Sequence, residues 1–185
     1  MAQTPSNMLP LGTIAPAFVL PDVDGKMHSL DDAAGSRGYL VMFICNHCPF
    51  VMHVADELAR LGKDCKTRNV AVFAINSNDF ENYPADSPAK MKDEKARRGY
   101  TFPYLVDEDQ SVARAYNAAC TPDFYLFDGD RKLVYRGQLD GSRPGNNVAV
   151  DGSDLRGAID ALLAGEPVSD EQIPSIGCNI KWRQG

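Results

Sequence analysis

Two short apolar runs with an amphipathic stretch between them dominate the first half of this chain. Residues 39–44 and 70–75 are continuously apolar and too short for helices, which predicts two buried strands. From Val51 to Leu61 the apolar residues recur at steps of three and four, which predicts an amphipathic helix that ends near Gly62. A strand, a helix and a strand of these lengths predict two parallel strands joined by a right-handed crossover.

The second half of the chain carries shorter elements and stronger turn signals. Pro88 and Gly99 are expected to begin and end a helix over residues 88–98. The sequence Asp-Gly-Asp at 128–130 separates two apolar segments and predicts a β-hairpin. The other expected elements are a strand at 104–106, a short helix at 111–116, hairpin strands at 124–127 and 132–138, and a last helix at 154–164.

The two ends of the chain lack such patterns. Residues 1–20 are expected to form an irregular lead-in, and residues 166–185, interrupted by Pro167 and Pro174, an irregular tail. No stretch rich in Gly, Ser or Pro divides the remainder. The element order predicts a single α/β domain over residues 1–185, with a mixed central sheet and helices on both faces.

Composition narrows the expected partners and compartment. The 185 residues carry a formal net charge of −6 and no basic stripe, so nucleic acid is not an expected partner. The longest apolar run is too short to cross a bilayer, and the N-terminus lacks the pattern of a secretory leader, so no membrane partner is expected. We therefore expect a cytoplasmic protein whose five cysteines form no structural disulfide framework.

The motif Cys45-Asn46-His47-Cys48 lies where the first buried strand ends and the amphipathic helix begins. A thiol at the start of a helix faces unpaired backbone N–H groups and the positive end of the helix dipole, which favour the thiolate. Two cysteines three residues apart share one helical face, so a small adjustment lets them form a disulfide. The motif therefore indicates a redox-active pair that needs no cofactor, with Cys45 as the more acidic thiol.

A metal site is an alternative for the same residues. Cysteine together with His47 or His53 suits zinc or copper. A closed zinc site needs four ligands, usually from two paired motifs, and this sequence has one CxxC motif. We assign no metal ligand, but a metal-binding module or copper chaperone stays open as a function.

Four segments resemble the thioredoxin-like superfamily, in the redoxin branch that includes the alkyl hydroperoxide reductase and thiol-specific antioxidant proteins. Residues 45–51 read CNHCPFV, residues 15–20 resemble the APxFxL opening of that branch, and residues 121–127 resemble its cis-proline loop and the strand after it. Residues 174–182 resemble the C-terminal signature of the soluble CNHCPFV proteins. The resemblance covers nearly the whole chain and implies a thioredoxin-like fold.

The resemblance also implies roles for individual residues. Cys45 corresponds to the cysteine that attacks a disulfide, and Cys48 to the one that resolves the mixed disulfide. Pro122 corresponds to the cis-proline that faces the pair, and Thr121 would offer its backbone to an extended substrate. The implied function is thiol–disulfide exchange that reduces protein disulfides. Its substrates would be disulfide-containing proteins or small thiols, with an unidentified dithiol or reductase as electron donor.

A thiol peroxidase is a competing function. Cys48 is followed by proline, as peroxidatic cysteines often are, so Cys48 would attack the peroxide in that case. Cys45 stands where peroxiredoxins have a threonine whose hydroxyl positions the peroxide, which weakens this alternative.

The other candidate residues have more than one interpretation. His47 either stabilises a thiolate and modulates the redox pair or is a solvent-facing spacer. Cys120 is either a third redox thiol or a small buried residue. Cys178 pairs with Cys120, acts as a second resolving cysteine, or packs in the tail. Cys65 is expected to be a partly exposed bystander.

Overall fold

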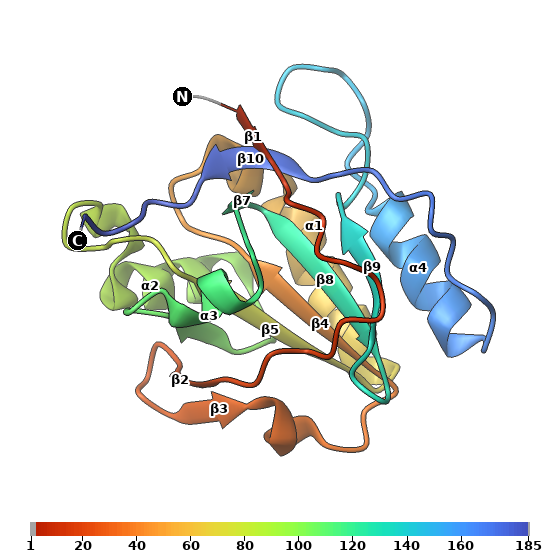
Figure 1. The fold of residues 1–185 in the computed structure, drawn as a ribbon. Coiled ribbons are helices and arrows are strands. Elements are labelled where there is room, and N and C mark those ends of the chain that lie inside the picture. The colour runs from red at the N-terminus through yellow and green to blue at the C-terminus, as the bar shows by residue number, and fades with distance from the viewer. Residues whose placement is uncertain (1–2, 185) are drawn as a thin grey trace.

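The central sheet has five strands in the order β6-β5-β4-β8-β9 (Figure 1). The computed structural model describes residues 3–184. β4, β5 and β6 are parallel, β8 is antiparallel to β4, and β9 is antiparallel to β8. The strands are β4 (Gly38–Phe43), β5 (Val70–Asn76), β6 (Tyr104–Val106), β8 (Asp123–Asp128) and β9 (Leu133–Gly137). The predicted parallel strand pair with a helix between its strands, the hairpin and the mixed sheet are confirmed.

Helices cover both faces of this sheet because alternate strand residues point to opposite sides. One face packs against α1 and α4, and the other against α3 and the hairpin of β2 and β3. Besides the strands of a smaller sheet, the elements outside the central sheet are β2 (Val19–Pro21), β3 (Met27–Ser29), η1 (Leu30–Ala33), α1 (Pro49–Thr67), η2 (Pro84–Asp86), α2 (Pro88–Arg98), α3 (Ser111–Ala115) and α4 (Ser153–Leu163). The predicted arrangement of helices is confirmed.

Gly62 lies inside α1, although the sequence predicted that the helix ends there. The helix continues to Thr67. The ring of Phe102 lies so close that any Cβ at position 62 would overlap it. Glycine therefore permits close packing at this point instead of ending the helix.

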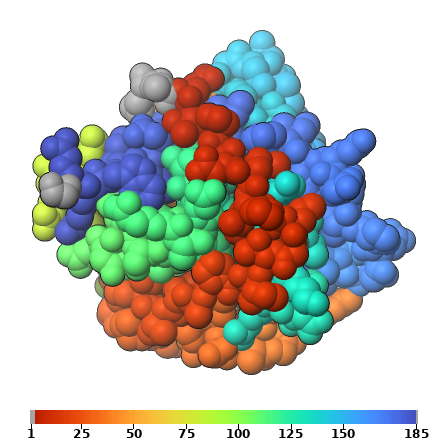
Figure 2. Space-filling view, in the orientation of Figure 1, coloured from red at the N-terminus to blue at the C-terminus, as the bar shows by residue number. Residues whose placement is uncertain are grey.

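A second, smaller sheet joins the two ends of the chain. Its strands are β1 (Gln3–Pro5), β10 (Ile176–Asn179) and β7 (Cys120–Thr121), with β10 in the middle and antiparallel to both neighbours. Figure 1 shows β10 between β1 and β7, and Figure 2 shows N-terminal and C-terminal residues side by side on one face. The prediction of irregular ends is wrong here, since these short strands are formed by partners distant in the chain.

Candidate active site

The CxxC segment connects the carboxyl end of β4 to the first turn of α1. Cys48 is the N-cap residue of α1, and Pro49 occupies the first helical turn. Cys45 lies in the loop that precedes the helix. The junction is the predicted one, but the helix begins directly after the second cysteine of the motif and not at the first.

Both sulfurs of the motif are buried against the loop that carries Thr121 and Pro122. Cys45 is 3% exposed and Cys48 is 0% exposed. Cys45 Sγ lies 3.4 Å from Thr121 Oγ1, and Cys48 Sγ lies 3.3 Å from the Thr121 carbonyl oxygen. The Thr121–Pro122 peptide bond is cis, as predicted. The structure thus brings together the four residues that the resemblance had singled out.

The two thiols of the motif compete for one proton, and the structure favours the negative charge on Cys48. The hydrogen bond with the Cys45 thiol lowers the pKa of Cys48 most, and the contacts of Cys48 with the Cys178 thiol and the Val51 backbone N–H lower it further. The pKa of Cys45 is raised by its hydrogen bond to Cys48, by burial and by the charge of Asp86. The expectation that Cys45 is the more acidic thiol is wrong, because Cys45 donates its proton in a hydrogen bond to Cys48, is buried, and lies near the carboxylate of Asp86.

A buried carboxylate, that of Asp86, lies beside the motif. Asp86 is 1% exposed and accepts hydrogen bonds from the Asn46 N–H at 2.7 Å and from Asn78 Nδ2 at 2.8 Å. Its other contact is with Nδ1 of His47, at 2.5 Å. The sequence did not identify Asp86, because it lies in a turn-forming segment with no spacing relation to the cysteines.

His47 is held in place on both sides. Its ring stacks on Tyr83, with ring centroids 5.9 Å apart, and the Asp86 carboxylate raises the pKa of His47. His47 is therefore an anchored residue of the site and not a free, solvent-facing spacer.

β10 occupies the edge of the cis-proline loop. Cys178 of β10 pairs with Thr121, and Ser175 Oγ donates a hydrogen bond to the Pro122 carbonyl oxygen at 2.5 Å. A Cβ at Gly177 would overlap the Thr121 carbonyl oxygen, so only glycine allows this close approach. The backbone edge that the sequence assigned to a substrate peptide is paired here with the chain's own tail.

Cys178 approaches the motif more closely than the sequence suggested. Its Sγ lies 2.8 Å from the Sγ of Cys48, and its side chain is 2% exposed. The sequence left three roles open for Cys178, and the structure places its sulfur beside that of Cys48. All five cysteines are unpaired.

The remaining two cysteines make no hydrogen bond with the other three. Cys120 precedes Thr121 in β7, so its side chain points to the opposite face of that strand, and its Sγ lies 3.8 Å from the Pro122 carbonyl oxygen. Cys65 is buried in α1, where burial raises its pKa to about 11. The expectation that Cys65 is partly exposed is wrong.

A metal site was the alternative for this region. Among the described residues, Cys45, His47 and Asp86 offer one donor atom each, and these atoms lie within 4.8 Å of one another. Cys48, which the sequence included in a metal site, is not part of this group. Three donors are one fewer than a closed zinc site uses.

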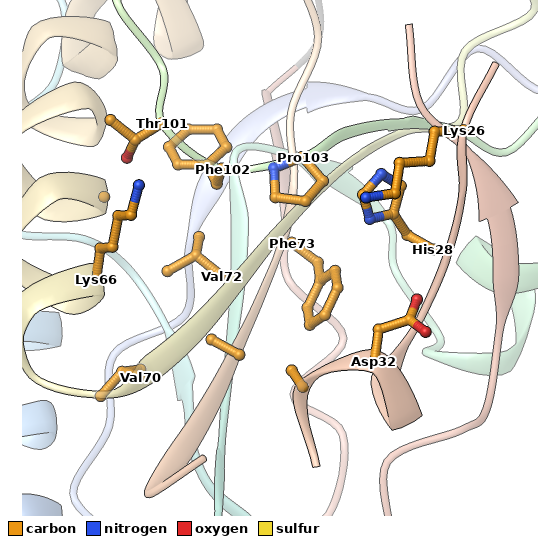
Figure 3. A pocket seen from close by; sticks show the side chains of 13 residues that line it. Lys26, His28, Asp32, Lys66, Val70, Val72, Phe73, Thr101, Phe102 and Pro103 are labelled. Carbon is orange, nitrogen blue, oxygen red and sulfur yellow. The ribbon is translucent and has the colours of Figure 1, made fainter. Parts of the chain in front are cut away.

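A cleft of about 360 Å³ lies between β3, β5 and the end of α1 (Figure 3). Lys26 and Lys66 stand at its rim, and Val72, Phe73 and Phe102 form apolar walls. No cysteine is among the residues that line it. The cleft is therefore separate from the thiol cluster.

Comparison with known sequences assigns most of the chain to one family. The model of the AhpC/TSA family matches residues 11–136. The thiol-disulfide oxidoreductase ResA of Geobacillus kaustophilus is 30% identical over 140 residues, which cover 74% of this chain and 75% of ResA. A Mycobacterium tuberculosis protein named as a peroxiredoxin is 31% identical over 115 residues, which cover 62% of this chain and 68% of that protein.

Comparison with solved structures extends the similarity over the whole chain. An uncharacterized conserved protein from Geobacillus kaustophilus is 56% identical, with a TM-score of 0.98 and coverage of 100% of this chain and 98% of that one. A hypothetical protein from Sinorhizobium meliloti is 50% identical, with a TM-score of 0.97 and coverage of 98% and 100%. The thiol:disulfide interchange protein DsbE of Chlorobium tepidum, 22% identical, has a TM-score of 0.67 over 84% of this chain and 99% of its own. The predicted thioredoxin-like fold is confirmed.

The sequence predicted a cytoplasmic location, and this prediction is wrong. The matches to ResA proteins and to DsbE contradict it. The physical reason is that CxxC oxidoreductases work in oxidising compartments as well as in the cytosol, so neither the fold nor the number of cysteines identifies the compartment. None of the described helices combines the length and the apolar character needed to cross a membrane.

Proposed function

Because the chain belongs to the AhpC/TSA family, we propose that it is a thiol–disulfide oxidoreductase with Cys45 and Cys48 as its redox pair. The relatives named ResA support this activity. A protein with this activity has disulfides or thiols as its substrates. The observation that carries the proposal is the position of both sulfurs at the β4–α1 junction against Thr121.

The first step is attack by Cys45 on a substrate disulfide. Cys45 acts first because it keeps 3% exposure, whereas Cys48 has none. The proton that the two sulfurs share moves to Cys48 as Cys45 becomes the nucleophile, and the hydroxyl of Thr121, 3.4 Å away, donates to the Cys45 thiolate. One substrate sulfur leaves as a thiolate and takes the proton from Cys48, which becomes a thiolate again, while the other substrate sulfur stays bound to Cys45.

The second step is resolution by Cys48. Its position at the N-cap of α1 and the Val51 N–H favour the Cys48 thiolate, which attacks the Cys45 sulfur. A Cys45–Cys48 disulfide forms and the second substrate thiolate leaves, so the substrate gains two electrons and the protein loses two. A dithiol or a reductase then restores the two thiols.

His47 and Asp86 modulate the first step in this proposal. The negative charge of Asp86 opposes a thiolate on Cys45 and raises its pKa. Protonated His47 pairs with Asp86 at 2.5 Å and offsets that charge. The protonation of His47 therefore makes Cys45 easier to ionise.

The occupied edge of β7 limits how a protein substrate binds. Thr121 pairs with β10, so its backbone can receive an extended peptide only when β10 moves away. We infer that the substrate is a small disulfide or a disulfide in a flexible segment that reaches Cys45. In this proposal Pro122 lies next to the substrate that approaches Cys45. Cys120 helps to hold the cis-proline loop in place through its contact with the Pro122 carbonyl oxygen.

The test is to trap the mixed disulfide. In Cys48→Ser the first step proceeds but resolution does not, so a disulfide substrate is expected to remain bound to Cys45. Mass spectrometry would find it on tryptic peptide 38–60, in which Cys45 is then the sole cysteine. Cys45→Ser should trap no substrate, and Cys65→Ser should behave as wild type. Release from Cys48→Ser at the wild-type rate would overturn the assignment of Cys48.

Thiol peroxidase activity is the second candidate. Cys48 is a buried N-cap thiol with a lowered pKa that is followed by Pro49, and one relative is named as a peroxiredoxin. In this case the Cys48 thiolate would attack a peroxide, form a sulfenic acid and release water, and then condense with Cys45 to form the disulfide and a second water. Peroxide consumption that persists in Cys45→Ser and disappears in Cys48→Ser would favour this candidate.

A further inference from the structure

We propose that Cys178 is a third redox thiol of this site, which exchanges with the Cys45–Cys48 disulfide and takes Cys48 as its partner. The proposal rests on the proposed function, because the exchange starts from the Cys45–Cys48 disulfide. The sulfurs of Cys48 and Cys178 are 2.8 Å apart. A disulfide has a sulfur separation of about 2.05 Å, so a shift of less than about 1 Å would bond them.

Cys178 is fixed in this position by its strand. β10 pairs with β1 on one side and with β7 on the other, and Cys178 is opposite Gln3 and Thr121. Beyond the strand, Ile180 N–H donates to the Ala119 carbonyl oxygen at 3.1 Å. The Cys178 thiol is thus held at Cys48 by the fold and not by a mobile tail.

Cys48 is the sulfur that the other two share. It forms hydrogen bonds with Cys45 and with Cys178. When Cys45 and Cys48 are bonded, the Cys178 sulfur can attack Cys48, so that the Cys48–Cys178 bond forms as the Cys45–Cys48 bond breaks. Cys45 leaves as a thiolate and takes the proton of Cys178, so the step needs no oxidant or reductant.

The exchange has two consequences for the site. It returns Cys45, the cysteine with residual exposure, to the thiol form while the protein remains oxidised. It also ties β10 covalently to the start of α1, which keeps the tail on the edge of β7. Reduction by the electron donor would release the tail again.

Tryptic peptides distinguish the possible disulfides. Cys45 and Cys48 share peptide 38–60, and Cys178 lies in peptide 157–181. A Cys45–Cys48 bond therefore stays within one peptide, whereas a Cys48–Cys178 bond links two. Cys65 lies in peptide 64–66 and Cys120 in peptide 115–131, so bonds to them would also be recognised.

The experiment oxidises the full chain with one equivalent of diamide, quenches with acid, alkylates the free thiols and digests with trypsin. We expect wild type to give both the bond within peptide 38–60 and the link from 38–60 to 157–181. Cys45→Ser should give only the link, Cys178→Ser only the internal bond, and Cys65→Ser both products as in wild type. These mass assignments do not depend on enzymatic activity.

Two results would overturn the inference, and they differ in what else they affect. If wild type forms the bond within peptide 38–60, and neither wild type nor Cys45→Ser forms the link to peptide 157–181, then Cys178 is not a redox thiol and the proposed function stands. If wild type forms no disulfide involving peptide 38–60, the proposed redox pair fails, and the role of Cys178 fails with it.

Discussion

At the scale of single residues, the placement of charge decides which sulfur of the motif carries the thiolate. The Cys48 sulfur accepts a hydrogen bond from the Cys45 thiol, whereas Cys45 lies near the carboxylate of Asp86. A negative charge near a thiol makes its ionisation harder and raises its pKa. Asp86 therefore opposes the ionisation of the Cys45 thiol until a positive charge offsets that of the carboxylate.

Replacing Asp86 by asparagine tests this effect. Removing the negative charge lowers the pKa of Cys45, so the thiolate is present at lower pH. At a pH at which His47 is neutral, alkylation of the site by iodoacetamide should therefore become faster, by about three- to tenfold. The rate measured against pH, with peptide 38–60 followed by mass spectrometry, checks this expectation.

Asp107→Asn is the matched control. Asp107 is also fully buried, but its partners are Ser77 and the backbone N–H groups of Val112 and Ala113, and not the thiols. This variant should leave the alkylation profile unchanged. An Asp86→Asn profile that moves to higher pH, or one that Asp107→Asn reproduces, would contradict the role given to Asp86.

The sequence predicted part of this site and missed the rest. Cys45 and Cys48 were found because the CxxC spacing and the strand-to-helix change of period are local signals. Pro122 required the family resemblance. Asp86 and the contact of Cys178 could not be predicted, because both depend on the tertiary placement of segments that are irregular or very short.

At the scale of elements, the central sheet and its helices were predictable and the strands at the chain ends were not. α2 has the predicted bounds because Pro88 and Gly99 mark both ends. β10 has only four residues, and its formation depends on the edges of β1 and β7. A pattern of period two cannot be recognised in so short a segment.

Gly177→Ala tests how tightly β10 is held against the cis-proline loop. The added methyl group would overlap the Thr121 carbonyl oxygen, which cannot move freely because it belongs to the backbone. We expect a loss of about 1–3 kcal/mol in the free energy of unfolding, measured by urea denaturation, and faster alkylation of Cys178.

Gly157→Ala is the control variant, and it is expected to raise the free energy of unfolding instead of lowering it. A Cβ at Gly157, inside α4, meets nothing within 4 Å. This variant should be more stable than wild type by about 0.5–1 kcal/mol, since alanine favours the helix. Equal stability of Gly177→Ala and wild type would show that β10 is not held closely at Thr121.

At the scale of the whole molecule, the two ends of the chain complete the site. β1 supports β10, β10 covers β7, and β7 leads into the cis-proline loop that contacts both sulfurs of the motif (Figure 1). The AhpC/TSA match ends at residue 136, so β10 lies beyond it. Within the proposed function, the family fold supplies the CxxC pair and the tail adds the third thiol and limits access.

Insulin reduction with dithiothreitol as donor, measured beside hydrogen peroxide consumption, separates thiol–disulfide exchange by this protein from peroxidase activity. We predict that wild type and Cys65→Ser accelerate insulin reduction, and that Cys45→Ser and Cys48→Ser fall to the uncatalysed rate, because each lacks one thiol of the pair. Reduction of insulin by Cys45→Ser and Cys48→Ser as fast as by wild type would contradict the assignment of Cys45 and Cys48 as the redox pair. Peroxide consumption by wild type without insulin reduction, retained in Cys45→Ser and lost in Cys48→Ser, would also contradict it.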